Sequence, residues 1–177
     1  MLTGPPGAGK TATAELLAAQ LPRSVCLETD WFWQVLRVGR VDPWLPEADE
    51  QNRVAIDAAS AAMGRYAAGG YAVVGEGIVG PWFLARVAAA LADHELPLHY
   101  AVLRPPREAC VERVRRRSDG GSGIPSGPVR HMWGEFSDLG PYERHVLDNQ
   151  HLSPAETASA VLGLVSEGAL LLPAAGP

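Results

Sequence analysis

The segment GPPGAGKT, residues 4–11, decides how the chain folds. It matches the pattern G-x-x-x-x-G-K-[ST] at every fixed position, with apolar residues before it and a predicted helix after it. Glycines let backbone N–H groups curl around phosphate oxygens, and the following helix points its N-terminus at the anion. Lys10 would reach the terminal phosphates, and the Thr11 hydroxyl would bind Mg²⁺. Because Lys10 is the single lysine of the chain, a chance glycine-rich turn explains this match poorly.

The composition is that of one domain without the positive charge of a nucleic-acid-binding or membrane-binding protein. The chain has 177 residues, of which 47% are hydrophobic and 20% are charged, and its net charge is -5. This length fits a single core. A mildly acidic chain lacks the electrostatic footprint of a protein that binds nucleic acid or an anionic membrane, so we expect neither. We see no signal peptide and no apolar run of about 18 residues, and we therefore expect a cytoplasmic protein. We also expect it to be either a monomer or a homodimer.

Short apolar runs alternate with longer helical ones, which is typical of a parallel sheet wrapped by helices. Strands are predicted at residues 1–3, 24–29, 71–75, 96–103 and 144–148. Helices are predicted at 10–21, 30–38, 47–68, 81–92, 105–117 and 153–167, the last one opening with a capping box. We expect a single domain, residues 1–177, with a lid region at 118–138 and a loosely packed tail at 168–177. The Gly/Ser/Pro-rich residues 119–128 should hold no regular element and be mobile.

Two acidic side chains are predicted to face the phosphate loop from the ends of strands. Asp30 follows the strand at 24–29, and Glu76 ends the strand at 71–75. In a parallel α/β sheet these carboxyl ends open onto the ligand crevice, where Asp30 can take the proton of an attacking hydroxyl. Glu76 can hold Mg²⁺ or its water shell, and Glu28 is a weaker candidate on the same side. The alternatives are a helix N-cap for Asp30 and a polar strand end without a ligand for Glu76.

Arginines cluster at the end of the helix predicted at residues 105–117. Arg113 and Arg117 are spaced i, i+4 and share one helix face. Phosphoryl transfer spreads negative charge over the equatorial oxygens, which arginine side chains neutralise, and a lid that carries them would also exclude water. The alternative is a solvated basic helix end, which the helix dipole favours.

Tryptophans lie beside the predicted catalytic groups. Trp31 and Trp33 follow Asp30, and Trp82 follows the strand at 71–75. Such side chains suit a partly apolar, aromatic or sugar-like acceptor, although ordinary core packing would also explain them. A gluconate-like acceptor would need cationic contacts, and Arg53 is one side chain that can supply them.

The sequence resembles small P-loop kinases of the gluconate kinase, shikimate kinase and chloramphenicol phosphotransferase type. The phosphate loop carries most of the resemblance, and the turn at Asp30, the segment VERVRRR at 111–117 and the ending LDNQHLSPAET at 147–157 add to it. The resemblance implies a five-stranded parallel sheet of order 2-3-1-4-5. It also implies that Arg113 stacks on adenine, that Arg117 touches the phosphates and that Asp30 acts as the base.

These motifs predict a phosphotransferase that uses ATP and Mg²⁺ and moves the γ-phosphate to a hydroxyl of a small molecule, such as an antibiotic or natural product. A nucleoside or nucleotide kinase and a nucleotide-dependent ATPase or switch protein are the alternatives. The expected catalytic residues are Asp30, Lys10 and Arg117. The expected nucleotide-binding residues are Gly4, Gly7, Ala8, Gly9, Lys10, Thr11, Thr13, Arg113 and Arg117. The acceptor would be bound by Asp30, Trp31, Trp33, Arg53, Glu76 and Trp82, and the metal by Thr11 and Glu76.

Overall fold

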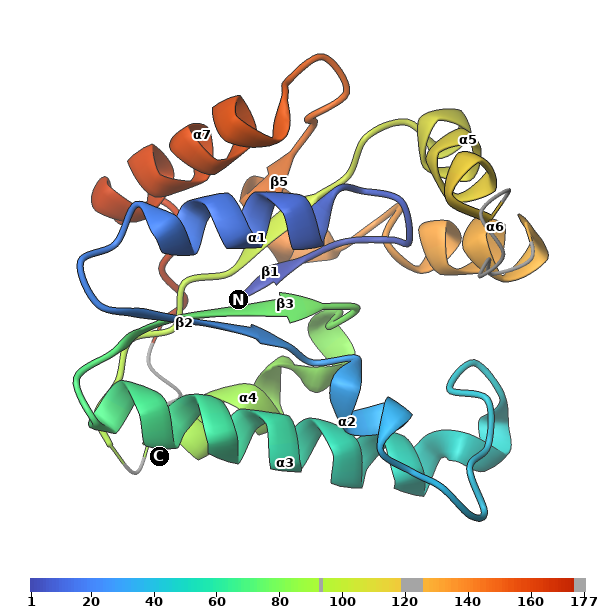
Figure 1. Ribbon diagram of the computed structural model, residues 1–177, viewed down its shortest axis with the longest axis horizontal. Coiled ribbons are helices and arrows are strands. Elements are labelled where there is room, and N and C mark those ends of the chain that lie inside the picture. The colour runs from blue at the N-terminus through green and yellow to red at the C-terminus, as the bar shows by residue number, and fades with distance from the viewer. Residues whose placement is uncertain (93, 119–125, 174–177) are drawn as a thin grey trace.

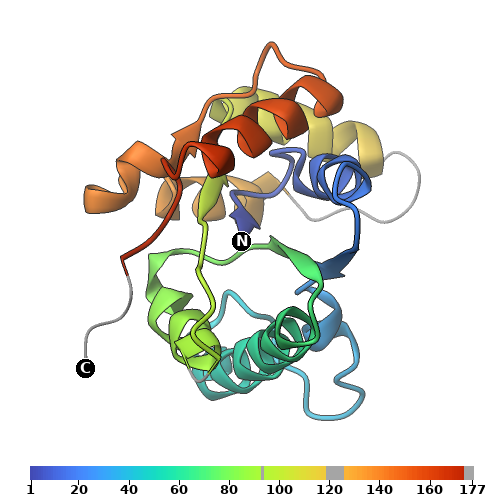
Figure 2. The same cartoon turned by 90° about the vertical axis from the view of Figure 1, so that its left-hand side faces the viewer.

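The strands form one parallel sheet with helices on both faces (Figure 1 and Figure 2). The computed structural model describes residues 1–92, 94–118 and 126–173. Neighbouring strands are parallel in the order β2-β3-β1-β4-β5, which confirms the predicted order. The strands are β1 (Leu2–Thr3), β2 (Ser24–Glu28), β3 (Ala72–Gly77), β4 (Ala101–Leu103) and β5 (Val146–Leu147).

Two pairs of helices cover the sheet. α1 (Lys10–Ala19) packs against α7 (Pro154–Ser166) on one face, and α3 (Asp49–Ala68) packs against α4 (Pro81–Ala92) on the other. Beyond the carboxyl ends of the strands, at the right of Figure 1, lie α2 (Trp31–Gln34), α5 (Arg107–Ser118) and α6 (Ser126–Glu135). The 3-10 helices are η1 (Pro46–Ala48) and η2 (Gly140–His145). None of the helices in the described ranges has the length and hydropathy needed to cross a membrane.

Apolar side chains fill the space on both sides of the sheet. Leu17 and Val161 belong to the core under α1 and α7, while Ile56 and Val87 belong to the core under α3 and α4. β3 is buried from Val74 onward, as expected for a central strand with both faces covered. This packing fixes the carboxyl ends of the strands, and it therefore fixes the segments that follow them.

Helix α6 begins inside the stretch that the sequence predicts to be irregular. Its helical structure starts at Ser126, while residues 119–125 of that stretch lie outside the described residues. Val129 is fully buried, and the Trp133 Nε1 donates a hydrogen bond to the Pro105 carbonyl at 3.0 Å. Tertiary contacts with α5 thus outweigh the poor helix propensity of the glycine and proline at the start of α6.

The tail after α7, which the sequence predicts to be loosely packed from residue 168, makes two backbone hydrogen bonds with the segment before β4. Leu170 is buried, and its carbonyl accepts a hydrogen bond from the Tyr100 N–H at 2.8 Å. The Leu172 N–H donates to the Leu98 carbonyl at 2.9 Å. Because residues 98–100 pair with this tail, the apolar run predicted as a strand from residue 96 joins the sheet only from Ala101.

Candidate active site

The phosphate loop joins β1 to α1 through glycines in conformations that side chains rarely adopt. Gly4, Gly7 and Gly9 have φ angles of 144°, 82° and 93°. A Cβ atom at Gly7 would also overlap the Cys110 carbonyl of α5, so the loop can lie against that helix only with glycine there. Gly9 is the N-cap of α1 and provides no side-chain capping hydrogen bond. The first backbone N–H groups of α1 are thus left for an anion, which fits the predicted phosphate site.

The Lys10 ammonium is buried within this loop. Lys10 is 9% exposed, and its Nζ donates a hydrogen bond to the Pro5 carbonyl at 3.2 Å. Burial lowers the pKa of Lys10, and the nearby Asp30 and Glu76 carboxylates partly oppose this shift. An ammonium has three donors, and a neutral carbonyl occupies only one of them here. Lys10 can therefore also donate to a phosphate.

Thr11 and Glu76 meet beside the loop. The Thr11 Oγ1 donates a hydrogen bond to Glu76 Oε1 at 2.9 Å. Glu76 is 2% exposed, and burial raises its pKa, although the Thr11 hydrogen bond and the Lys10 charge oppose the shift. The pair offers oxygen ligands of the kind that Mg²⁺ prefers. The described residues contain no cluster of three or more acidic, histidine or cysteine ligands, so the pair would bind Mg²⁺ only together with phosphate oxygens.

Asp30 lies at the turn between β2 and α2 with its carboxylate available to a ligand. Asp30 occupies the N-cap position of α2, but its side chain makes no capping hydrogen bond to that helix. The end of β2 approaches β3 closely, because the Thr29 N–H donates to the Glu76 carbonyl at 2.7 Å. A Cβ atom at Gly77 would overlap the Thr29 Oγ1 and come within 3.3 Å of Asp30 Oδ1. Gly77, which sequence reasoning missed, therefore sets the position of Asp30.

We expect Gly77→Ala to lower the free energy of unfolding by about 1–3 kcal/mol, because the new methyl group would push Thr29 away from β3. Gly163→Ala in α7 is the matched control, since a Cβ atom there meets nothing within 4 Å. That variant should be as stable as the wild type or gain up to about 1 kcal/mol. Urea unfolding of the two variants measures the difference, and equal stabilities would contradict the close approach of β2 to β3.

Arg113 and Arg117 lie on the face of α5 that is near the phosphate loop. The guanidinium of Arg113 donates to the carbonyls of Gly7 and Gln150, each at 3.5 Å. Arg117 is exposed, and its charge contributes to the lowered pKa of Lys10, so the two cations lie within electrostatic reach of each other. Arg113 thus connects the phosphate loop with the loop after β5.

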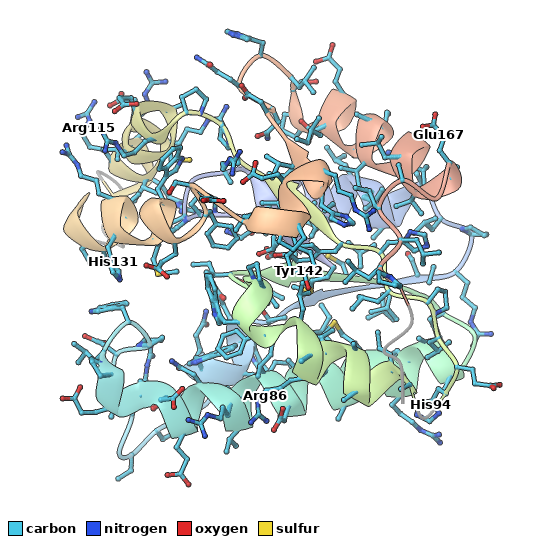
Figure 3. All side chains as sticks on the ribbon, turned by 180° about the vertical axis from the view of Figure 1, so that it is seen from behind. Arg86, His94, Arg115, His131, Tyr142 and Glu167 are labelled. Atoms are coloured by element: carbon cyan, nitrogen blue, oxygen red, sulfur yellow. The ribbon has the colours of Figure 1, made fainter. Side chains whose placement is uncertain are left out.

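The other two arginines of this cluster have acidic partners on their own helix. Arg115 and Arg116 form ion pairs with Glu112 at 2.9 Å and 2.8 Å. Figure 3 shows Arg115 at the outer edge of α5. These two residues behave as the solvated basic helix end that was the alternative for the whole cluster.

Asn149 is a further polar contact of the phosphate loop that sequence reasoning did not single out. Its Nδ2 donates to the Ala8 carbonyl at 3.0 Å, and its Oδ1 is buried without a hydrogen-bond partner in the described part of the chain. The Thr13 Oγ1, under the loop in α1, is also buried without such a partner there. Asn149 falls within the ending at 147–157 that carries the resemblance, which was the available signal.

A cavity of about 460 Å³ opens beside Asp30. It lies between the phosphate loop, the segment after β2, the start of α4 and helix α6, which carries His131 (Figure 3). Pro6 of the phosphate loop forms part of its wall, so the cavity adjoins the predicted phosphate site. Its lining includes the aromatic residues Trp33, Trp44, Trp82 and Phe83 and the polar residues Asp30, Arg40, Asn52, His131 and Glu135.

Of the predicted acceptor-binding residues, Trp33 and Trp82 line this cavity, whereas Trp31 and Arg53 do not. Trp31 and Trp33 are two positions apart on a helix, so they point to different sides. Trp31 is 57% exposed and is not part of the cavity wall. Arg53 forms an ion pair with Asp49 on the exposed side of α3. The structure therefore does not support acceptor contacts for Trp31 and Arg53.

The two remaining acidic candidates also lie outside the cavity. Glu76 lies beside Thr11 and is not part of the cavity wall. Its position therefore fits metal binding better than acceptor binding. Glu28, the weaker candidate for the base, is exposed at the end of β2 and is not part of the lining. Asp30 alone among the carboxylates of these strand ends reaches the cavity.

Two amide side chains of α3 hold the loop that forms one wall of the cavity. The Gln51 side chain exchanges two hydrogen bonds with the backbone of Val41, each at 2.8 Å. Asn52 donates to the Pro43 carbonyl at 2.8 Å and accepts from the Trp33 Nε1 at 2.7 Å. Sequence reasoning missed both, because amides near the start of a helix have no distinctive pattern. These hydrogen bonds hold the loop in place without a bound ligand.

Comparison with known families agrees with this geometry. A family model described as an AAA domain matches residues 1–137. The chain belongs to this family. It is a small P-loop kinase-like protein, with the fold and phosphate loop that the motifs predicted. No curated protein matches it by sequence.

Several solved structures share the fold of this P-loop protein. A Deinococcus radiodurans tunicamycin resistance protein is 25% identical, with a TM-score of 0.66 and coverage of 97% of this chain and 96% of that one. A sugar kinase from Janibacter sp. is 18% identical, with a TM-score of 0.75 and coverage of 93% and 92%. Shikimate kinase from Acinetobacter baumannii, solved with shikimate, is 19% identical, with a TM-score of 0.58 and coverage of 94% and 92%.

Proposed function

We propose that the protein transfers the γ-phosphate of ATP to a hydroxyl of a small molecule bound in the cavity beside Asp30. One observation carries this proposal. The Asp30 carboxylate acts electrostatically on the Lys10 ammonium in the phosphate loop, and it also lines the cavity. A group at that junction can touch a phosphate donor and a hydroxyl acceptor at once. The fold by itself would not separate a kinase from another nucleotide-binding protein.

The nucleotide would be held by the groups around the phosphate loop. The free N–H groups at the start of α1 and the Lys10 ammonium suit the triphosphate, with Arg117 near its terminal end and Arg113 toward the adenine. Thr11 and Glu76 would hold Mg²⁺, which when bound neutralises charge on the β- and γ-phosphates. The buried, unpartnered Oδ1 of Asn149 fits a ligand that brings a donor to this edge of the loop.

In the reaction, the acceptor oxygen forms a bond to the γ-phosphorus while the bond from that phosphorus to the β–γ bridging oxygen breaks. Asp30 accepts the hydroxyl proton, and ADP leaves with the electron pair of the broken bond. Lys10 and Arg117 stabilise the charge that spreads over the transferred group. We further propose that α6, which belongs to the predicted lid region 118–138, closes over the acceptor and excludes water.

Two alternatives receive less support. A nucleotide kinase needs several arginines for the acceptor phosphate, and Arg40 is the one arginine among the described residues that line the cavity. An ATPase or switch protein has no need for an aromatic cavity next to its phosphate site. Two of the structural neighbours are named as kinases of small molecules and one as a tunicamycin resistance protein, which supports an acceptor of that size.

The test is an acceptor screen with ATP carrying a labelled γ-phosphate, in which mass spectrometry detects the labelled product. We expect at least one hydroxyl compound to gain the phosphoryl group, with one ADP formed for each product. ATP hydrolysis that no added alcohol changes would favour the ATPase alternative instead. Transfer to nucleoside monophosphates alone would favour the nucleotide kinase.

A further inference from the structure

We propose that the acceptor is an uncharged alcohol with an aromatic ring, held by stacking on exposed tryptophans in a cavity that disfavours anions. This inference rests on the proposed function and adds the chemical class of the acceptor. It excludes sugar acids and nucleoside monophosphates as good acceptors. It depends on two independent observations, which are the state of the tryptophan rings and the charges of the cavity wall.

The Trp82 ring is held firmly on one side and open on the other. It lies directly on Gly80, where a Cβ atom would overlap three ring atoms. It packs edge-on against Phe136, which directly follows α6, with ring centroids 5.6 Å apart, and against Phe83 at 6.2 Å. Even so, Trp82 is 45% exposed and lines the cavity. A large apolar ring that is fixed yet open inside a concave site is a stacking surface for a ligand.

Trp44 gives a second open ring on the loop that follows α2. It is 42% exposed and also lines the cavity. The hydrogen bonds of Gln51 and Asn52 to the neighbouring residues Val41 and Pro43 hold this loop in place. The ring is therefore presented to the cavity without support from a ligand. Binding to a preformed surface costs less conformational entropy than ordering a loose one.

The charges of the wall disfavour an anionic acceptor. Among the described lining residues, the carboxylates are Asp30 and Glu135, and the one guanidinium is Arg40. His131 shares a face of α6 with Glu135, because the two are spaced i, i+4. A bound triphosphate would add further negative charge through the adjoining phosphate loop. A carboxylate or phosphate on the acceptor would therefore meet more repulsion than attraction, whereas an uncharged acceptor would not.

The size of the cavity fits a molecule with at least one ring. Its volume of about 460 Å³ lies within the range of roughly 300–1,000 Å³ that is usual for drug-sized ligands. Apolar walls with a few polar groups are also usual for such sites. The hydroxyl would point to Asp30, and the ring would lie toward Trp82 and Trp44.

Three small alcohols test separately whether binding needs an aromatic ring and whether it tolerates a negative charge. 1-Phenyl-1,2-ethanediol has a ring and no charge, mandelate has the same ring with a carboxylate, and sorbitol has hydroxyls without a ring. Binding is measured by quenching of tryptophan fluorescence in the presence of Mg²⁺ and a non-hydrolysable ATP analogue, and transfer is measured separately with labelled ATP. We expect the diol to bind about tenfold more tightly than mandelate or sorbitol, which corresponds to about 1.4 kcal/mol.

Variants of the tryptophans test whether these rings are the cause. Trp82→Ala and Trp44→Ala should each weaken binding of the diol by about tenfold and leave binding of the nucleotide unchanged. Trp82→Phe, which keeps a ring on Gly80, should recover part of the loss. Trp31→Ala is the matched control, because Trp31 is even more exposed than the other two tryptophans but lies outside the cavity. Its affinity for the diol should equal that of the wild type.

The outcomes distinguish this inference from the proposed function. If the diol binds as expected but no probe is phosphorylated, the cavity still selects uncharged aromatic ligands, and the phosphotransferase function is contradicted. If sorbitol or mandelate is phosphorylated in preference to the diol, the function stands and the acceptor class is wrong. Failure of all three probes to bind, or an equal loss in Trp31→Ala, would also overturn the acceptor class.

Discussion

Replacing Lys10 with alanine should reduce phosphoryl transfer by about 10³-fold or more and weaken the binding of ATP. The buried ammonium is the cation that the phosphate loop itself provides, and it can stabilise the negative charge that develops on the transferred group. Transfer is measured with labelled ATP and an accepted alcohol, and binding by calorimetry. Full activity of this variant would remove the phosphate-loop assignment.

The loss should not come from unfolding, and Lys10→Met can show this. Burial lowers the pKa of Lys10, so the folded state disfavours the charged form and the ammonium costs stability at any pH below its unfolded pKa. Without nucleotide, the methionine variant should therefore be at least as stable to urea as the wild type. With nucleotide, only the wild type should gain stability, because only it binds ATP tightly. A less stable methionine variant would contradict this account of the buried charge.

Asp30→Asn should keep ATP binding while lowering kcat by about 10²-fold or more, as expected when a general base is lost. The amide has the size of the carboxylate but cannot accept the proton of the acceptor hydroxyl. Since Asp30 makes no capping hydrogen bond to α2, the substitution should leave the fold intact. Pre-steady-state transfer with saturating ATP measures the chemical step directly.

Glu28→Gln is the matched control for Asp30→Asn. It removes one negative charge two residues away, but Glu28 is exposed and outside the cavity. Its kcat should stay at the wild-type level. Equal activity of both variants and the wild type would assign Asp30 no part in the transfer.

The layered fold was predictable because its signals are local. The phosphate loop, the capping box of Ser153 and Glu156, and the bounds of α4 all follow from neighbouring residues, and the structure contains each of them. The start of α6 and the hydrogen bonds of the tail after residue 168 depend instead on long-range contacts. The partner of Trp133 is Pro105, and that of Leu170 is Tyr100, so composition alone could not reveal either.

The candidate site also has some residues that the sequence could place and others that depend on long-range packing. The positions of Lys10, Thr11 and Asp30 follow from a motif and from the geometry of parallel strands, so sequence could place them together. Which tryptophan lines the cavity depends on the rotation of a four-residue helix, and Trp33 does so while Trp31 does not. Helical spacing says that the two point to different sides, but only the packing says which side is the cavity.

The phosphate loop and the cavity beside Asp30 share few residues, and this has a consequence for the evolution of such proteins. Pro6 and Asp30 lie where the phosphate loop adjoins the cavity. The rest of the cavity wall comes from segments that would not contact the nucleotide. Under the proposed function, mutations at Trp44, Trp82 or His131 would change the acceptor while the nucleotide site stays intact. Divergence of this kind would leave the architecture shared and the chemistry of recognition free to drift, and it makes these three positions the natural starting points for redesign.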